Sequence, residues 1–219
     1  KSLLWTMKAL SSIDALRAAY VVLASASPRR RQLLSDILTL DPRVHVSDFE
    51  ENLDKSQHTP ASYVMQTARG KAADVYDRLA AETPPQLVIG ADTVVHLDGQ
   101  ILEKPADADD AICMLTELSG RAHEVLTGVA LLYRSAGAAG PEEKLFVERT
   151  IVHFAEVPRE AIEAYVRTGE PMDKAGSYGI QGAGGAFVSG INGCYYNVVG
   201  LPLHRFCKEL DVPKLKAIA

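Results

Sequence analysis

The chain has 219 residues, of which 47% are hydrophobic and 23% are charged, which is typical of a globular protein and excludes a disordered or collagen-like chain. No apolar run approaches the roughly 18 residues that a membrane-spanning helix needs, so we expect no membrane partner. The net charge of −5 speaks against a nucleic-acid binder, which usually presents a basic surface.

Strand and helix signals alternate along the chain, which predicts an α/β protein with a mixed, twisted sheet flanked by helices. Lys8, Asp14 and Arg17 interrupt any signal-peptide core in the N-terminal segment, so we expect a cytoplasmic protein. The same segment, residues 1–19, does not begin with methionine and is predicted to be an appendage or an artificial remnant.

The first half of the chain carries two strands and two helix starts. The apolar run Tyr20–Ala24 predicts a strand, and Ser27-Pro28 after it is a cap and first-turn pair that begins a helix. Thr59-Pro60 repeats that signal before a stripe of apolar residues at helical spacing. Leu87–Leu97 predicts a long strand that ends at Asp98-Gly99, a strong hairpin turn.

Further strand and helix signals follow in the second half of the chain. They predict a helix from Asp107 to Gly120, strands at Val125–Tyr133 and Lys144–Ala155 joined by the loop Arg134–Pro141, a helix from Pro158 to Gly169, tight turns in Gly176–Gly193, a strand at Cys194–Val199 and a last helix from Pro202. Because no linker or repeat divides the chain, residues 20–211 are predicted to form one domain of two lobes, followed by a tail at 212–219.

Cysteine and histidine give no sign of a metal centre. The widely spaced Cys113, Cys194 and Cys207 form no CxxC pair, which argues against a disulfide framework or a structural zinc site. The six histidines form no HxH or HExxH motif, and we expect them to be structural.

Three arginines crowd the first turn of the helix that begins at Ser27-Pro28. A helix N-terminus carries about half a positive charge, so Arg29, Arg30 and Arg31 are locally unfavourable there unless an anion binds. Backbone N–H groups, two serine hydroxyls and guanidinium forks together suit phosphate oxygens. We predict phosphate binding for Arg29 and Arg30, and a surface position paired with acids for Arg31.

A single acid interrupts the long predicted strand. An unpaired carboxylate is unfavourable inside a sheet, so Asp92 has to meet a metal, a cation or solvent at a cleft, and Gly90 is expected to leave room beside it. Lys71 lies at the edge of the apolar stripe of the preceding helix, where spacing alone slightly favours extension to solvent over reaching into a cleft. The pairs Glu50-Glu51 and Glu103-Lys104 look like ordinary surface pairs when taken alone.

A glycine-rich segment with polar groups occurs near the C-terminal end of the chain. In Asp173–Gly182, ionic, hydroxyl and amide groups stand among glycines, so the backbone can approach a ligand while Gln181 offers a donor and an acceptor. Glycine-rich turns also build bulges and lobe junctions, so the pattern alone leaves both interpretations open.

Seven motifs, in this order, resemble those of the Maf family of nucleoside triphosphate pyrophosphatases, also called septum-formation-inhibitor-like proteins. They are Leu23–Arg30 (LASASPRR), Gly90–Val95 (GADTVV), Leu102–Pro105 (LEKP), Leu118–His123 (LSGRAH), Glu170–Gly176 (EPMDKAG), Tyr178–Gly182 (YGIQG) and Val198–Pro202 (VVGLP). The resemblance spans about residues 20–211 and implies an elongated α/β fold with the substrate in a central cleft between two lobes.

The resemblance also implies a metal-dependent hydrolase that cleaves a nucleoside triphosphate to the monophosphate and pyrophosphate, with Mg²⁺ or Mn²⁺ as cofactor. By motif position, it implies triphosphate contacts from Ser25, Arg29, Arg30, Lys71 and Lys104, a proton acceptor in Asp92, metal ligands in Glu51 and Asp92, base selection by Arg29, Thr93 and Gln181, and further site residues in Ser27, Asp173 and Lys174. The base-selecting set is of the dTTP/UTP type, and a glutamine amide can pair in part with a uracil or thymine edge.

The implied mechanism follows from charge. Metal and cationic side chains neutralise the triphosphate while Asp92 takes a proton from the attacking water. The alternative is a non-catalytic nucleotide-binding regulator of cell division, although such a binder needs no carboxylate inside a strand. The resemblance further implies a homodimer, and it leaves open whether the cellular role is nucleotide-pool cleaning or division control.

Overall fold

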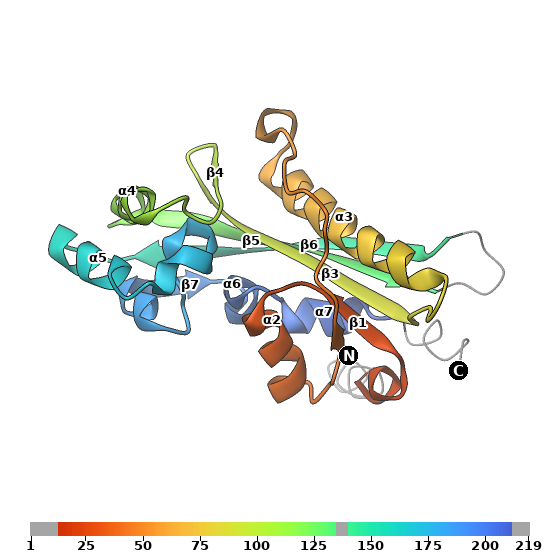
Figure 1. Cartoon of the computed structure of the whole chain (residues 1–219). Helices are drawn as coiled ribbons and strands as arrows, with labels where there is room; N and C mark the ends of the chain where they lie inside the picture. Colours follow the sequence, from red (N-terminus) through yellow and green to blue (C-terminus); the bar gives the residue numbers. More distant parts are fainter. Residues whose placement is uncertain (1–12, 135–139, 212–219) are drawn as a thin grey trace.

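A mixed seven-stranded sheet runs along the long axis of the computed structural model, which describes residues 13–134 and 140–211 (Figure 1). The strands follow the order β2-β1-β3-β5-β6-β7, and β4 pairs with β3 outside this path. β1 is parallel to β2 and β3, and the other pairs are antiparallel. The strands are β1 (Val21–Ala24), β2 (Arg43–Val44), β3 (Leu87–Leu97), β4 (Gln100–Leu102), β5 (Ala122–Tyr133), β6 (Glu142–Phe154) and β7 (Val188–Asn192). The predicted mixed α/β single domain is therefore confirmed.

Three helices begin where the sequence predicts them, because each start carries a side-chain cap. Ser27, Thr59 and Asp107 accept hydrogen bonds from the backbone N–H three residues ahead, at 3.4, 3.2 and 2.9 Å. The helices are α2 (Pro28–Gln32), α3 (Pro60–Ala80), α4 (Ala108–Leu118), α5 (Arg159–Val166), α6 (Tyr195–Val199) and α7 (Leu203–Glu209). Shorter helical turns are η1 (Leu33–Ile37), η2 (Lys55–Gln57), η3 (Glu170–Asp173), η4 (Ala175–Ser177) and η5 (Ala183–Phe187).

Helices cover the sheet at both ends of the molecule (Figure 1). At the end that carries β1, successive side chains of a strand lie on opposite faces of the sheet. Val22 and Val88 pack against α3 on one face, and Leu23 and Ile89 pack against η1 and α7 on the other. α4 and α5 enclose a separate core at the far end, around Phe154. The sheet thus joins the hydrophobic cores at its two ends, and the middle of the molecule lies between them.

Gly90 lets α3 approach the sheet closely. A Cβ atom at this position would overlap the carbonyl oxygen of Ala68 on α3. The room that Gly90 is predicted to leave beside Asp92 is therefore occupied by the backbone of α3. The effect of Gly90 is indirect, since the close approach places Lys71 of α3 beside Asp92 on the same face of β3.

The predicted strand at Cys194–Val199 is wrong, because residues 195–199 form α6 and the edge strand β7 precedes them. Polar contacts favour the helix. The Thr150 hydroxyl accepts the Cys194 N–H at 3.0 Å, and the buried Asn197 amide donates to Thr150 Oγ1 and to the Val125 carbonyl, both at 3.0 Å. A short apolar run cannot by itself distinguish these two outcomes.

Part of the predicted N-terminal appendage is helical, at residues 13–18, and its Leu16 is buried in the same core as Phe206. The remaining residues of the predicted appendage and tail, 1–12 and 212–219, lie outside the described residues, as do residues 135–139 of the predicted loop. In the described parts of the chain, no helix is both long and apolar enough to cross a bilayer.

Candidate active site

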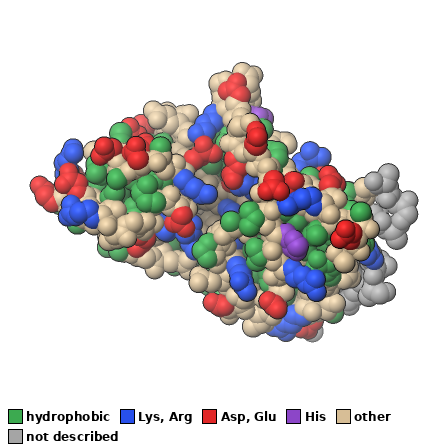
Figure 2. All heavy atoms as spheres, viewed as in Figure 1, with side chains coloured by type: hydrophobic (Ala, Val, Ile, Leu, Met, Phe, Trp, Pro, Cys, Tyr) green, Lys and Arg blue, Asp and Glu red, His purple; other side chains and the backbone are tan. Residues whose placement is uncertain are grey.

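A pocket of about 840 Å³ opens near the middle of the molecule, within the size range of small-ligand sites. Figure 2 shows this face hollowed there, with basic and acidic side chains gathered around the hollow. Its walls come from segments far apart in the sequence: the β1–α2 junction, the middle of β3, the residues after β4, and the glycine-rich segment from η3 onward. The predicted cleft is therefore present, and it brings Arg29 and Asp92 together.

One edge of β3 is open at the pocket. β1 pairs with residues 87–90 of β3 and β4 pairs with residues 95–97, both on the edge opposite β5. Of the strands that the structure describes, none pairs with residues 91–94 on that edge. Asp92 contacts α3 on one face and Thr93 contacts α2 on the other, so both faces of the strand contribute to the site.

Asp92 faces an ammonium group that also binds a second carboxylate. Lys71 Nζ lies 2.9 Å from Asp92 Oδ1 and 2.6 Å from Glu51 Oε2. Burial raises the pKa of Asp92 above its usual value, although the charges of Lys71 and Arg30 act in the opposite direction. A buried carboxylate with a raised pKa at a cleft is a candidate general base.

The structure corrects two expectations about charged residues. The Lys71 side chain is only 11% exposed and points into the pocket wall, so its expected extension to solvent is wrong. Glu51, Glu103 and Lys104 line the pocket rather than forming ordinary surface pairs, whereas Glu50 is exposed and is not part of the lining. Helix spacing could not show either result, because the partners come from other elements.

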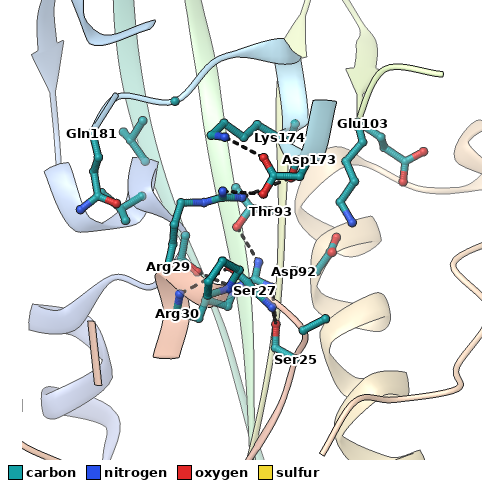
Figure 3. Close-up of a pocket in the computed structure, with 18 of the residues that line it drawn as sticks. Ser25, Ser27, Arg29, Arg30, Asp92, Thr93, Glu103, Asp173, Lys174 and Gln181 are labelled. Atoms are coloured by element: carbon teal, nitrogen blue, oxygen red, sulfur yellow. Dashed lines mark hydrogen bonds and ion pairs between the residues drawn. The ribbon is translucent and has the colours of Figure 1, made fainter. Parts of the chain in front are cut away.

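Arg30 ties three elements of the pocket together. Its Nε donates to the Gly200 carbonyl at 2.9 Å, and its two terminal nitrogens donate to Ser25 Oγ and Thr93 Oγ1, each at 3.0 Å (Figure 3). Burial is the main cause that lowers the pKa of this guanidinium. Arg30 thus fixes the β1–α2 junction against β3. These three bonds use three of its five N–H groups and leave two.

Arg29 forms an ion pair with a residue from the other side of the pocket. Its guanidinium donates to Asp173 Oδ2 at 2.8 Å and to the Asp173 carbonyl at 3.2 Å, while Lys174 Nζ lies 2.6 Å from Asp173 Oδ1. Burial alone would raise the pKa of Asp173, but the hydrogen bonds from Lys174 and Arg29 outweigh it and lower the pKa. Arg31 is exposed and is not among the lining residues, as expected, but it forms no ion pair with the acids of the described residues, so the predicted pairing is wrong.

Gln181 lies at the opposite end of the pocket from Asp92, with Arg29 between them (Figure 3). Ser27 also lines the pocket, but its hydroxyl accepts the Arg30 N–H and so caps α2. All the site residues predicted from the sequence therefore reach one pocket, in which a carboxylate–ammonium cluster and an exposed amide are separated by arginine.

Two glutamates of the pocket wall, Glu103 and Glu170, are not among the site residues predicted from the sequence. Glu103 accepts from the Tyr63 hydroxyl at 2.7 Å and lies 2.6 Å from Lys55 Nζ. Burial and this hydrogen bond raise the pKa of Tyr63, which stays protonated and can donate. Both glutamates stand inside motifs of the resemblance, LEKP and EPMDKAG, which is the signal that could have identified them.

A metal ion would find two carboxylates here. Within the described ranges, no group of three or more His, Cys, Asp or Glu side chains is arranged to hold a metal. Asp92 and Glu51 nevertheless share one cation, the Lys71 ammonium. Mg²⁺ sites commonly combine one or two carboxylates with phosphate oxygens of a substrate, so this pair fits such an ion. The pocket can therefore bind a polyanion and present a base to it.

Comparisons with known proteins agree with this geometry. The family model described as Maf-like protein matches residues 20–212. A Clostridium kluyveri protein named dTTP/UTP pyrophosphatase is 49% identical over 191 residues, which cover 87% of this chain and 96% of that protein. A Clostridium perfringens protein of the same name is 45% identical over 87% of this chain and 95% of its own length.

A human protein extends the comparison. Its name is probable bifunctional dTTP/UTP pyrophosphatase/methyltransferase protein, and it is 49% identical over 195 residues. The match covers 87% of this chain but only 31% of the human protein. Because the family model spans nearly the whole chain and the bacterial relatives match over nearly their full length, this chain belongs to the Maf family.

Proposed function

We propose that this chain hydrolyses a nucleoside triphosphate, with dTTP or UTP preferred, to the monophosphate and pyrophosphate. The observation that carries the proposal is that Asp92, a buried carboxylate with a raised pKa, shares one pocket with five lysine and arginine side chains. The two bacterial relatives named dTTP/UTP pyrophosphatase support the same substrate class here.

In this proposal the cationic side chains bind the triphosphate. Arg29 exchanges the Asp173 carboxylate for a phosphate oxygen, because both are acceptors for a guanidinium fork. Lys71 and Lys104 add positive charge from the other walls, and Ser25 offers a hydroxyl. Arg30 chiefly holds the pocket wall, and its contact with the triphosphate stays a prediction.

Glu51 and Asp92 would hold Mg²⁺ or Mn²⁺. When bound, the ion supplies positive charge that neutralises phosphate oxygens and favours attack at phosphorus. Asp92 accepts the proton of the attacking water through a carboxylate oxygen, and burial makes it a stronger base than an exposed aspartate. Lys71 holds this carboxylate in place at 2.9 Å.

Base selection is assigned to the far end of the pocket. The Gln181 amide can both donate and accept, which suits the acceptor–donor–acceptor edge of uracil or thymine. Thr93 Oγ1 lies 3.0 Å from the Arg30 guanidinium and 2.9 Å from Thr127 Oγ1. Thr93 therefore acts by shaping the pocket wall beside Arg30 rather than by a free hydroxyl.

The test is release of pyrophosphate from a panel of nucleoside triphosphates, with Mg²⁺ and with Mn²⁺. We expect dTTP and UTP to be cleaved fastest, and EDTA to stop the reaction. Tight binding of dTTP without release of pyrophosphate would instead support the non-catalytic regulator. A cytoplasmic location and a homodimer stay predictions, and light scattering of the purified chain tests the second.

A further inference from the structure

A carboxylate outside the proposed catalytic cluster organises the glycine-rich wall of the pocket. Glu170, the first residue of η3, accepts three hydrogen bonds: from the Tyr165 hydroxyl at 2.9 Å, from the Ala183 N–H at 3.0 Å and from the Gly184 N–H at 3.3 Å. Burial acts to raise the pKa of Glu170, but these donors outweigh it and lower the pKa. The carboxylate therefore stays ionised and keeps its acceptors occupied.

The same arrangement holds the backbone on both sides of Gln181. Two residues before it, the Gly179 N–H donates to the Tyr165 hydroxyl at 3.1 Å. Two residues after it, the Ala183 N–H donates to Glu170 Oε2. Because Tyr165 also donates to Glu170, one connected network fixes both ends of a five-residue segment with Gln181 at its centre.

The network explains the glycine at position 182 of this segment and the one at position 184, just after it. A Cβ atom at Gly182 would lie 2.5 Å from Glu170 Cδ, and one at Gly184 would lie 2.6 Å from the Tyr165 hydroxyl oxygen. Neither glycine has a positive φ, so close packing against the two side chains is what excludes a larger residue. The segment is thus shaped around Tyr165 and Glu170.

Glu170 is poorly suited to contact the substrate itself. An ionised carboxylate only accepts hydrogen bonds, so contact with the triphosphate group, which presents only acceptors, would be repulsive, and a donor of the base or ribose would have to compete with the protein donors. Both of its oxygens already accept from the protein. Its place in the pocket wall is therefore better explained by its effect on the segment that carries Gln181.

We infer that Glu170 and Tyr165 are positioning residues for nucleobase selection, which hold Gln181 at the distance from Arg29 and Asp92 where a pyrimidine base can be recognised. The inference rests on the proposed function, because it requires that Gln181 contacts the base. It predicts that the network controls which base is accepted and leaves the hydrolytic step intact.

The experiment measures kcat and KM for dTTP, UTP and dCTP with the wild type, E170Q and E163Q. Glutamine at position 170 keeps the size of the side chain, but its NH2 group then faces the N–H and O–H donors of the network. We therefore expect KM for dTTP to rise about tenfold, with kcat within about threefold of the wild type. The preference for dTTP over dCTP should fall by a similar factor. E163Q removes a carboxylate of α5 that forms an ion pair with Arg159 and lies outside the network, and it should change neither value.

A second pair of variants approaches the network from the segment itself. G182A introduces a Cβ against the Glu170 carboxylate and should reproduce the loss of selectivity, whereas G190A, where nothing lies within 4 Å, should not. If E170Q does not fold, Y165F, which removes one hydroxyl from the network, carries the same prediction.

The outcomes separate the two proposals. A wild type that cleaves dTTP, UTP and dCTP equally, or not at all, overturns the assigned base selection and the positioning role with it. A selective wild type whose selectivity survives in E170Q and G182A, even at a uniformly lower rate, overturns the positioning role alone. A uniform decrease is what a merely structural role would produce.

Discussion

Replacing Asp92 by asparagine separates the chemistry of this residue from its contribution to stability. Asparagine keeps the shape and can still accept the Lys71 hydrogen bond, but it cannot take a proton from water. Loss of a general base typically lowers kcat by about 10²–10⁴-fold, which corresponds to roughly 3–5 kcal/mol in the activation barrier. We therefore expect D92N to release almost no pyrophosphate.

The same substitution should leave the fold as stable as before or more stable. Burial raises the pKa of Asp92 above its usual value of 3.8, so its contribution to stability is greatest below pH 3.8 and is lost as the pH rises through the raised pKa. Each tenfold change in its acid dissociation constant is worth about 1.4 kcal/mol, and each kcal/mol corresponds to about 2–4 °C in Tm for a chain of this size. Neutral asparagine removes the free-energy cost of burying the ionised carboxylate, and Lys71 keeps Glu51 as a partner.

The assay combines pyrophosphate release with thermal unfolding at pH 8 in EDTA, for the wild type, D92N and D98N. Asp98 lies in the exposed β3–β4 turn with an ion pair to Arg121, so D98N is a matched control that should alter neither measurement. A D92N rate within about threefold of the wild type, only ~0.7 kcal/mol in the barrier, would refute the role of general base. A clear fall in its Tm would refute the reasoning on burial.

Three further changes test the framework of the site. A lysine ammonium cannot reproduce the three separately directed hydrogen bonds of the Arg30 guanidinium, so R30K should lower the free energy of unfolding by about 2–4 kcal/mol in urea denaturation; an unchanged midpoint would contradict this. G90A pushes a Cβ into the Ala68 carbonyl and should lower both stability and activity, whereas G190A should lower neither. Burial lowers the pKa of His123 to about 4, so the neutral ring favours folding above pH 6.5 and the wild type should lose about 2 kcal/mol more than H123Q between pH 7 and pH 5.

Much of the fold could be predicted because its signals are local. The caps at Ser27, Thr59 and Asp107 and the turn at Asp98-Gly99 act within four residues, and each marks an element boundary in the structure. The failure at residues 194–199 has the opposite cause. The side-chain NH2 group of Asn197 donates to Thr150 and Val125, which are 47 and 72 residues away in the sequence, so the local pattern carries no sign of these partners.

The site shows the same division between local and distant information. Asp92 could be singled out because a carboxylate inside an apolar strand requires a partner, but the partner could not be named. Lys71 and Glu51 reach it only because α3 packs on β3 and the chain between β2 and η2 passes the pocket. The motif resemblance identified these residues, whereas composition and spacing alone left competing interpretations.

The register of β1 explains why the chemistry collects at this point of the sheet. Ala24, the last residue of β1, pairs with Gly90 of β3, so Ser25 and the arginine-bearing start of α2 leave the sheet beside Asp92. β3 continues past the carboxyl end of its parallel neighbour β1, and side chains on both of its faces meet there. Ligands of open α/β sheets bind beyond the carboxyl ends of the strands. A polyanion at this edge can therefore contact the first turn of α2 and the base on β3 together. Neither α2 nor β3 alone provides both the anion contacts and the base. The parallel pairing of β1 with β3, which brings them together, cannot be read from the sequence of either segment.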